Sequence, residues 1–156
     1  MKTNGGFLVT KIKQLGDRIF ERILAEKNID AFNGAQGRIL YVLWQEDGVP
    51  IKIISEKSGL AITSLTTMLE RMEKNGLISR KTDEADKRKT LLFLTDKAKE
   101  LKEAYDSVSN EMGNIYYRDF TDKEILQFEE YLNRIRVNLE EWSDKLVSVL
   151  KIRFRT

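Results

Sequence analysis

The chain has 156 residues and a formal net charge of +2, and it contains neither cysteine nor histidine. This length suits one domain with its own core, and 41% hydrophobic with 33% charged residues is typical of a soluble, helix-rich globular protein. The missing thiols and imidazoles exclude disulfides, thiolate nucleophiles, zinc sites built from Cys and His, and imidazole general-base catalysis.

Several further classes of function are disfavoured by local sequence context. No glycine-rich loop, nucleophile elbow or calcium-loop motif gathers the carboxylates and lysines, so we expect no enzymatic activity, no metal site and no cofactor. No stretch approaches the roughly 20 apolar residues that a membrane span requires. The N-terminus lacks the apolar core and cleavage site of a signal peptide, so we expect a cytoplasmic protein without membrane contact.

The first predicted element is an amphipathic helix from Phe7 to about Glu26, after six loose residues. Its apolar residues recur at steps of three and four, which places them on one face of a helix. This stripe consists of Leu8, Ile12, Leu15, Ile19 and Ile23, and Phe20 and Leu24 widen it.

The next segment carries signals for two short helices. Asn33 with Gln36 three residues later predicts a capping box, and the helix that it starts closes at Trp44. Pro50 predicts the entry of a short helix, because its missing N–H is not needed in the first turn. A break at Ser58-Gly59 separates this helix from the next one, which is the helix-turn-helix arrangement.

The segment from Gly59 to Thr95 predicts a helix, a break, two strands and a charged loop. The apolar stripe of this helix is Leu65, Met68, Leu69 and Met72, at positions i, i+3, i+4 and i+7. The opposite side carries Thr63, Ser64, Thr66, Thr67, Glu70 and Arg71. Gly76 ends the helix after Asn75.

The strands are predicted at 77–78 and 91–94, joined by a polar hairpin loop from Thr82 to Lys89 with Lys87-Arg88-Lys89 at its tip. Between residues 51 and 95 there are nine basic and six acidic residues, a modest excess whose position counts for more than its size. A helix with a small polar face, followed by a basic hairpin, suits insertion into one DNA groove and reach into the next. We therefore predict a winged helix.

Two helices are predicted after the hairpin. Thr95 is placed to cap the first, whose apolar stripe is Ala98, Leu101, Tyr105, Val108, Met112 and Ile115. Thr121 and Glu124 form a second capping box. The last helix carries a stripe with a 3.5-residue period, namely Ile125, Phe128, Leu132, Ile135, Leu139, Trp142, Leu146 and Val149. The basic tail, residues 151–155, is predicted to be a frayed, solvated end, with DNA contact as the alternative.

The long apolar stripes of the terminal helices allow two interpretations, an intramolecular bundle or a twofold dimer with a second copy. We favour the homodimer, because a single winged helix does not require such long apolar stripes on its terminal helices. The predicted interface residues are Leu8, Ile12, Leu15, Ile19, Leu132, Ile135, Leu139, Trp142 and Leu146. A dimer presents two reading helices, so a pseudo-palindromic site with half-sites about one helical turn apart follows.

The same region carries a family resemblance. The run LTTMLERMEKNGLISR, residues 65–80, is followed by Asp86-x-Arg88 and then by Leu94-Thr95, and this combination resembles the MarR family of bacterial transcription regulators. The upstream GAQGRIL, residues 34–40, is similar to a segment in one branch of that family. The resemblance covers residues 33–99 closely, and the flanking helices only by pattern.

The resemblance implies a mainly α fold, a winged helix-turn-helix with a small β-hairpin wing and N- and C-terminal dimerisation helices that form a triangular dimer. The corresponding division is 1–32 for the N-terminal dimerisation helix, 33–95 for the DNA-binding lobe and 96–156 for the C-terminal dimerisation helices. It also implies that Arg88 enters the minor groove and that Asp86 holds its guanidinium. A narrow A·T minor groove has the negative potential that attracts such a cation.

The candidate DNA contacts fall into two groups. Thr63, Ser64, Thr66 and Thr67 carry hydroxyls, and the threonines also methyls, that suit base edges in the major groove. Thr67 stands near the place where relatives often have arginine, which predicts weaker direct readout or a preference for A·T-rich sites. The phosphate-contact candidates are Lys52, Lys57, Arg71, Lys87 and Lys89. The alternative interpretation is a solvated polar face, with Arg88 in an ordinary surface ion pair.

A regulatory ligand is the last expectation that the resemblance supports, because the family often responds to small aromatic or amphipathic molecules. Residues that would line a ligand cleft are Gln36, Arg38, Tyr41, Trp44 and Tyr105, which offer aromatic walls and a cation. Tyr41 and Trp44 are equally interpretable as core residues. Without cysteine and histidine, the branches that sense cysteine oxidation or zinc are disfavoured.

We therefore expect a homodimeric, sequence-specific regulator of transcription that binds double-stranded DNA, acts as a repressor on a pseudo-palindromic operator and is released by a small-molecule ligand. The alternative is a non-enzymatic winged-helix module that binds another protein and has lost DNA binding. The basic hairpin tip discriminates between them, because an interaction module has no reason to keep it.

Overall fold

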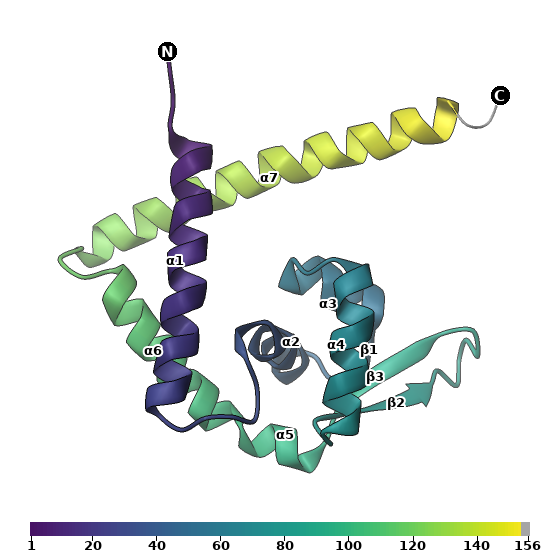
Figure 1. The fold of residues 1–156 in the computed structure, drawn as a ribbon. Coiled ribbons are helices and arrows are strands. Elements are labelled where there is room, and N and C mark those ends of the chain that lie inside the picture. The colour runs from purple at the N-terminus through teal and green to yellow at the C-terminus, as the bar shows by residue number, and fades with distance from the viewer. Residues whose placement is uncertain (154–156) are drawn as a thin grey trace. The chain divides into compact units, whose positions relative to one another are not determined.

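The computed structural model describes the backbone of residues 1–153 and the side chains of residues 1–147 (Figure 1). Its elements, in chain order, are α1 (Gly5–Glu26), α2 (Gly34–Gln45), β1 (Val49–Pro50), α3 (Ile51–Ser58), α4 (Ile62–Lys74), β2 (Ile78–Thr82), β3 (Thr90–Leu94), α5 (Asp96–Glu100), α6 (Lys102–Tyr116) and α7 (Asp122–Arg153). They group into two compact units, residues 1–113 and residues 114–156. In the part of the chain that is described, no helix is long and apolar enough to cross a membrane.

The helix boundaries of the first unit largely follow the local sequence signals. The predicted capping box is confirmed, because the Asn33 side chain accepts from the Gln36 N–H at 2.8 Å and Gln36 Oε1 accepts from the Asn33 N–H at 3.1 Å. The first helix begins at Gly5 rather than Phe7, and α2 ends at Gln45, one residue after Trp44. The break at residues 58–59 between α3 and α4 is confirmed.

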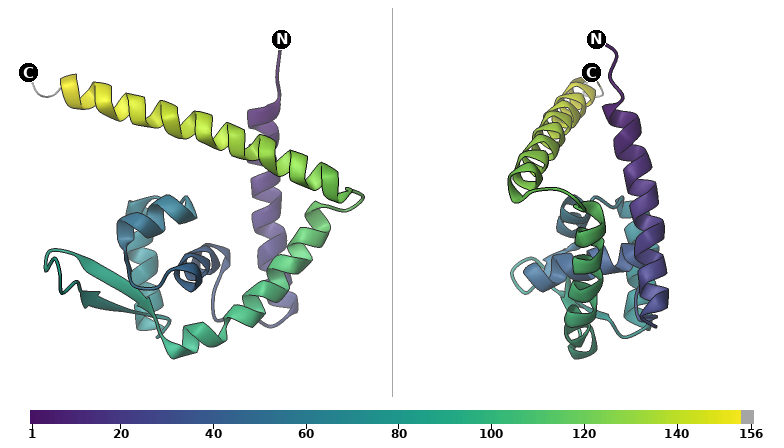
Figure 2. Two further views of the ribbon diagram at one scale, coloured as in Figure 1. Left: turned by 180° about the vertical axis from the view of Figure 1, so that it is seen from behind. Right: turned by 90° about the vertical axis from the view of Figure 1, so that its left-hand side faces the viewer.

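The antiparallel sheet has three strands in the order β1-β3-β2, one more than the sequence predicted. Strand β2 reaches from Ile78 to Thr82, so the predicted strand at 77–78 was too short and the loop begins one residue after Thr82. Since β2 and β3 pair over five residues each, they form a hairpin that extends away from α4 (Figures 1 and 2). The added strand β1 pairs with β3 through Val49 and Leu92.

One core holds the helices and strands of the first unit together. It contains Ile23 and Leu24 of α1, Phe32, the inner faces of α2, α3 and α4, Leu92 and Leu94 of β3, and Val108 and Met112 of α6. From the predicted stripe of α4, Leu65, Leu69 and Met72 are completely buried, and Met68 is half-buried. Burial of each such side chain stabilises the fold by roughly 1.5–3 kcal/mol. The core therefore fixes which face of α4 is turned outward.

The helix predicted after the hairpin is divided. Thr95 caps it as expected, but α5 ends at Glu100 and α6 begins at Lys102, with Leu101 between them. The apolar stripe continues across this break, because Ala98 and Val108 are both fully buried. Ile115, the last residue of the predicted stripe, is 37% exposed, so the stripe ends before it.

The second unit contains the end of α6 and the long helix α7. The predicted capping box is present: the Thr121 N–H donates to Glu124 Oε2 at 2.8 Å, and the Glu124 N–H donates to Thr121 Oγ1 at 3.3 Å. The hydrogen bond from the Thr121 backbone lowers the pKa of Glu124. Tyr117 packs against Phe120 and Phe128, and its hydroxyl donates to Glu129 at 2.7 Å. Partial burial and this carboxylate raise the pKa of Tyr117 to about 12.

The predicted interface stripes are exposed in both units. In α1 the exposed side chains are Leu8, Ile12 and Leu15, and Ile19 is half-buried; in α7 they are Leu132, Ile135, Leu139, Trp142 and Leu146. The prediction for Val149 and for the side chains of the basic tail lies outside the described residues. The helix itself extends to Arg153.

Candidate DNA-binding surface

The outer face of α4 is polar and exposed. It carries Thr63, Ser64, Thr66, Thr67 and Arg71, opposite the buried Leu65, Leu69 and Met72. Thr66 Oγ1 donates to the Ile62 carbonyl at 3.1 Å, which turns its hydroxyl back along the helix. The other three hydroxyls have no hydrogen-bond partner among the described residues. This face is therefore a row of small donors, acceptors and methyl groups, the type of surface that fits a major groove.

The start of α4 also suits a phosphate. Its N-cap is Ala61, which has no side-chain acceptor for the first turn, and the first turn contains no acidic residue. The missing cap costs about 1 kcal/mol of helix stability. A free helix N-terminus presents N–H groups and a positive partial charge, so an anion at this position restores the missing hydrogen bonds.

Hydrogen bonds within the loop between β2 and β3, from its backbone and from aspartate side chains, hold its shape. The Asp83 N–H donates to the Lys89 carbonyl, and the Lys89 N–H donates to the Asp86 carbonyl, both at 2.9 Å. Asp83 Oδ1 accepts from the Ala85 N–H at 2.9 Å. These bonds give the tip of the hairpin a defined shape in a segment without regular secondary structure.

Asp86 and Arg88 form the contact predicted at the tip. Asp86 Oδ1 accepts from both the backbone N–H and the Nε of Arg88 at 3.1 Å, and Asp86 Oδ2 accepts from Nη2 at 3.4 Å. The hydrogen bond from the Arg88 side chain is the main reason why the pKa of Asp86 is lowered. The Asp86 side chain is 28% exposed, whereas the Arg88 side chain is 91% exposed. Asp86 thus orients a guanidinium that stays accessible to a partner.

The predicted phosphate contacts differ in how free their charges are. Lys87 and Arg71 are exposed and have no carboxylate partner among the described residues, and Lys89 lies 3.9 Å from Asp86. Lys52 lies 3.9 Å from Glu56 in a loose ion pair, and Lys57 forms a short one at 2.6 Å with Glu46. Exposed pairs of this kind are worth about 0–1 kcal/mol, so a phosphate can replace the carboxylate at little cost.

Sequence reasoning missed several residues that support the hairpin. Arg80 Nε donates to Glu73 Oε2 at 2.9 Å, which ties β2 to the last turn of α4. On the other face of the hairpin, the Lys81 ammonium lies 5.1 Å from the centre of the Phe93 ring. The sequence carried no signal for the longer strand, because in ISRKT one apolar residue is followed by four polar ones and no alternation appears.

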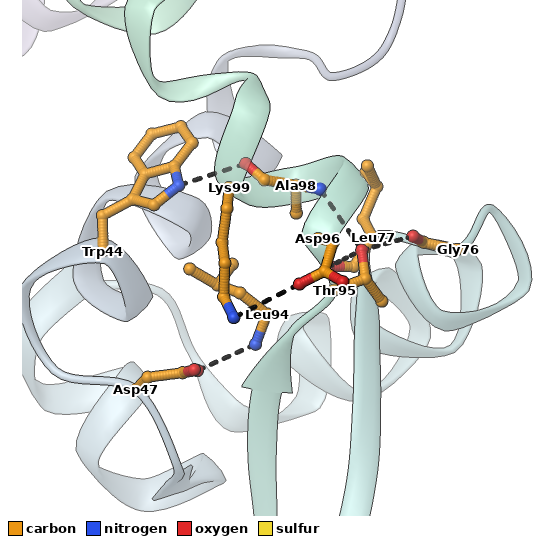
Figure 3. Close-up of polar contacts among 9 residues, drawn as sticks. All are labelled: Trp44, Asp47, Gly76, Leu77, Leu94, Thr95, Asp96, Ala98 and Lys99. Atoms are coloured by element: carbon orange, nitrogen blue, oxygen red, sulfur yellow. Dashed lines mark hydrogen bonds and ion pairs between the residues drawn. The ribbon is translucent and has the colours of Figure 1, made fainter.

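The root of the hairpin is fixed by the side chains of Asp47, in the turn after α2, and of Thr95, the N-cap of α5 (Figure 3). Asp47 Oδ1 accepts from the Leu94 N–H at 2.8 Å. Thr95 Oγ1 donates to the Gly76 carbonyl at 2.6 Å and accepts from the Ala98 N–H at 3.2 Å. The two ends of the hairpin are therefore bonded to each other and to the turn that follows α2.

The predicted ligand residues are only partly brought together. Tyr105 is at the centre of an aromatic cluster with Trp44, Tyr41, Phe20 and Phe32, whose ring centroids lie 5.3, 5.8, 6.0 and 6.0 Å away. Burial raises the pKa of Tyr105. The two phenylalanines were not among the predicted residues; Phe20 comes from α1, and Phe32 lies two residues before α2.

The polar members of the predicted ligand set already have partners. The Gln36 amide is used in the capping box of α2, and Arg38 Nη2 lies 3.9 Å from Asp17 Oδ1. The Trp44 indole donates to the Ala98 carbonyl at 3.1 Å (Figure 3). Only the aromatic part of the set therefore forms one cluster.

Comparison with known proteins gives the same assignment as the motifs. Residues 32–90 match the model of the MarR family. HTH-type transcriptional regulator TtmR of Methylorubrum extorquens (strain PA1) is 36% identical over 77 residues, 49% of this chain and 40% of that protein. The organic hydroperoxide resistance transcriptional regulator of Bacillus subtilis (strain 168) is 42% identical over 64 residues, 41% of this chain and 44% of that protein. The chain therefore spans less than half the length of these two relatives.

Solved structures share the fold at low sequence identity. A mutant of MarR from E. coli in complex with operator DNA has a TM-score of 0.75 and 22% identity, covering 83% of this chain and 91% of that one. BpsR of Bordetella bronchiseptica, whose DNA binding is regulated by 6-hydroxynicotinic acid, has a TM-score of 0.76 and 18% identity, covering 86% and 99%. These similarities confirm the predicted mainly α winged helix-turn-helix fold with a small antiparallel sheet.

The prediction that the chain is not an enzyme agrees with the curated relatives, which are transcription regulators. The matched segment contains α2, α3, α4, β2 and the whole hairpin loop as far as Thr90, and these elements carry the surface described above. Residues 32–90 therefore match the MarR family of transcription regulators, and the chain has the winged helix-turn-helix fold.

Proposed function

We propose that this chain is a transcription regulator that binds double-stranded DNA sequence-specifically, as a homodimer on a pseudo-palindromic operator. The observation that carries the proposal is the combination of an exposed, threonine-rich face on α4 with an exposed Arg88 held by Asp86 at the hairpin tip. Neither feature serves the core, and together they match the two grooves of a duplex. We expect the protein to act in the cytoplasm.

The face of α4 is the proposed reader of the major groove. Thr63, Ser64 and Thr67 contribute free hydroxyls, and Thr66 is exposed on the same face although its hydroxyl donates to the Ile62 carbonyl. Threonine methyls contact thymine methyls, whereas short hydroxyls accept or donate to either base pair without strong discrimination. We therefore propose moderate direct readout that favours A·T-rich half-sites.

Arg88 is the proposed reader of the minor groove. Its guanidinium is oriented by Asp86 before any DNA arrives, so little side-chain entropy remains to be lost on binding. A narrow A·T minor groove concentrates negative potential, and arginine is the side chain that fits it. Around these readers, Lys52, Lys57, Arg71, Lys87 and Lys89 are proposed to contact phosphates, which supplies affinity and salt dependence rather than sequence information.

The exposed apolar stripes support assembly with a second copy. In α1 they are formed by Leu8, Ile12 and Leu15, and in α7 Leu139 and Trp142 are 67% and 64% exposed. Apolar surface of this extent is rarely left in water by a stable monomer. We propose that residues 1–32 and 96–156 form the dimer and that residues 33–95 bind DNA, in preference to an intramolecular bundle of the same helices.

We further propose that the regulator is a repressor released by a small aromatic or amphipathic ligand. Support comes from the cluster of Tyr105, Tyr41 and Trp44, with the cation of Arg38 nearby on α2, and from BpsR, whose DNA binding responds to an aromatic acid. A ligand that binds one conformation better than another shifts the spacing of the two reading helices and so the affinity for DNA.

The decisive experiment selects bound sites from a random duplex library and measures the protein's mass in solution alongside. The proposal predicts an A·T-rich palindromic consensus and twice the chain mass. Substitution Arg88→Ala should lower affinity for the selected duplex about tenfold, which corresponds to about 1.4 kcal/mol. A chain that binds no duplex at low salt but captures a protein partner would instead support the interaction-module alternative.

A further inference from the structure

We infer that Asp47 is a positioning residue for DNA binding: its carboxylate fixes the root of the β2–β3 hairpin and thereby the direction in which Arg88 is presented. This inference rests on the proposed function, because it concerns the same hairpin. Asp47 itself lies in the turn between α2 and β1, far along the chain from Arg88, and no contact with DNA is assigned to it.

The Asp47 side chain accepts a hydrogen bond from a backbone N–H of β3 that strand β1 is too short to pair. Strand β1 has only two residues, and its pairing with β3 is extended by the Gly48 N–H, which donates to the Leu92 carbonyl at 3.0 Å. Leu94 lies two residues beyond Leu92, so its N–H points to the same edge of the strand. No backbone carbonyl of β1 reaches that N–H, and Asp47 Oδ1 accepts from it at 2.8 Å.

The other bonds at the root do not replace this one. Thr95 joins β3 to Gly76 and to α5 (Figure 3). Arg80 joins β2 to Glu73 of α4. Asp47 supplies a side-chain bond from the turn after α2 to the end of β3, beside the backbone bond from the Gly48 N–H to the Leu92 carbonyl. It is also an exposed residue, so it can be substituted without opening the core.

A small change in the direction of the hairpin at this bond causes a larger displacement at its tip. Leu94 lies five positions along the strand from Lys89 at the end of the loop, a length of roughly 16 Å, so a tilt of about 10° at the root moves the tip by about 3 Å. A guanidinium that must enter a groove does not tolerate a displacement of that size. Loss of the Asp47 contact therefore weakens binding through Arg88 while the fold remains.

Electrostatics and positioning predict opposite results, which makes the inference testable. Removal of the negative charge of Asp47 reduces repulsion with DNA phosphates, so a purely electrostatic role predicts equal or tighter binding for any neutral variant. A positioning role predicts that the affinity for DNA depends on whether the side chain at position 47 can accept the hydrogen bond from the Leu94 N–H. Asn keeps such an acceptor and Ala does not.

The experiment measures fluorescence anisotropy of a labelled selected duplex with wild type, Asp47→Ala, Asp47→Asn and Asp30→Ala. The last variant removes the same charge from the exposed connector between α1 and α2 and is the matched control. We expect about fivefold weaker binding for Asp47→Ala, and affinities within twofold of wild type for Asp47→Asn and Asp30→Ala. Thermal unfolding of each variant verifies the fold, and Asp47→Glu, which keeps the charge but shifts the carboxylate, provides the same test if the alanine variant unfolds.

A mutant cycle with Arg88→Ala separates this inference from the proposed function. In the Arg88→Ala background, Asp47→Ala should cause a clearly smaller loss than in wild type, because the contact of Arg88 no longer contributes. If Arg88→Ala weakens binding but Asp47→Ala binds as tightly as Asp47→Asn, or if the Asp47→Ala loss is undiminished without Arg88, the positioning role is refuted alone. If wild type binds no duplex, or if Arg88→Ala binds as well as wild type, the proposed function fails and this inference with it.

Discussion

Gly48 provides a quantitative test of how the hairpin is seated. Its φ is +72°, and a Cβ at this position would lie 2.5 Å from Cε1 and 2.8 Å from Cζ of the Phe93 ring. A left-handed backbone costs a residue with a side chain about 1–2 kcal/mol. Forcing the Phe93 ring aside adds about 1–3 kcal/mol of overpacking. Gly48→Ala should therefore lower the free energy of unfolding by about 2–5 kcal/mol.

Gly59 is the matched control for the backbone contribution. Its φ is +71°, but a Cβ there meets no atom within 4 Å. Gly59→Ala should therefore cost only the left-handed strain of about 1–2 kcal/mol. Urea denaturation followed by circular dichroism measures both variants, and adding Phe93→Ala to each isolates the ring contact. Equal destabilisation by the two alanine substitutions would refute the reasoning, because the contact between Gly48 and Phe93 would then contribute nothing.

Three further predictions concern charge and assembly. The hydrogen bond from Arg88 lowers the pKa of Asp86, so it stabilises the loop above the ordinary pKa of 3.8, and this stabilisation is lost as the pH falls through the lowered pKa. In Arg88→Ala, NMR titration should show the pKa of Asp86 rising toward 3.8, and an unchanged pKa would contradict the contact. Glu46→Gln should release the Lys57 ammonium and tighten DNA binding with a steeper salt dependence, whereas an unchanged affinity in gel-shift titrations would remove Lys57 from the phosphate contacts. Leu139→Asp should halve the mass in light scattering, and an intact dimer would exclude this part of α7 from the interface.

Features encoded by neighbouring residues were predictable from the sequence. The capping box of Asn33 and Gln36 and that of Thr121 and Glu124 were both read correctly, because each depends on residues three positions apart. The predicted buried stripe of α4 was also correct, because the 3.6-residue period alone shows which residues share one face of a helix. The exposed polar face of α4 followed from it.

Features that depend on contacts between distant segments were not predictable. Strand β1 has two residues and no pattern of its own, and it exists because Gly48 and Val49 meet β3 more than 40 positions later. The bond between Asp47 and Leu94 has the same origin. The break at Leu101 was missed because the apolar stripe continues through it, and periodicity reports which face is buried, not whether the helix is continuous.

The candidate site shows the same division. Asp86 and Arg88 lie two positions apart and were identified from their motif, and the structure brings them within hydrogen-bond distance. The partners that restrain the basic residues, such as Glu46 for Lys57, come from other elements and carry no local signal. Long-range packing therefore decides which of the predicted phosphate-contact residues are already paired with a carboxylate.

The central claim, that two copies read one duplex with α4 in the major groove and Arg88 in the minor groove, is tested most directly by hydroxyl-radical footprinting of the selected duplex. With wild type, we predict protected minor-groove segments on both flanks, related by the twofold axis of the palindrome. With Arg88→Ala, this flanking protection should disappear while the central protection remains. A single protected patch, or identical footprints for the two proteins, would contradict the account.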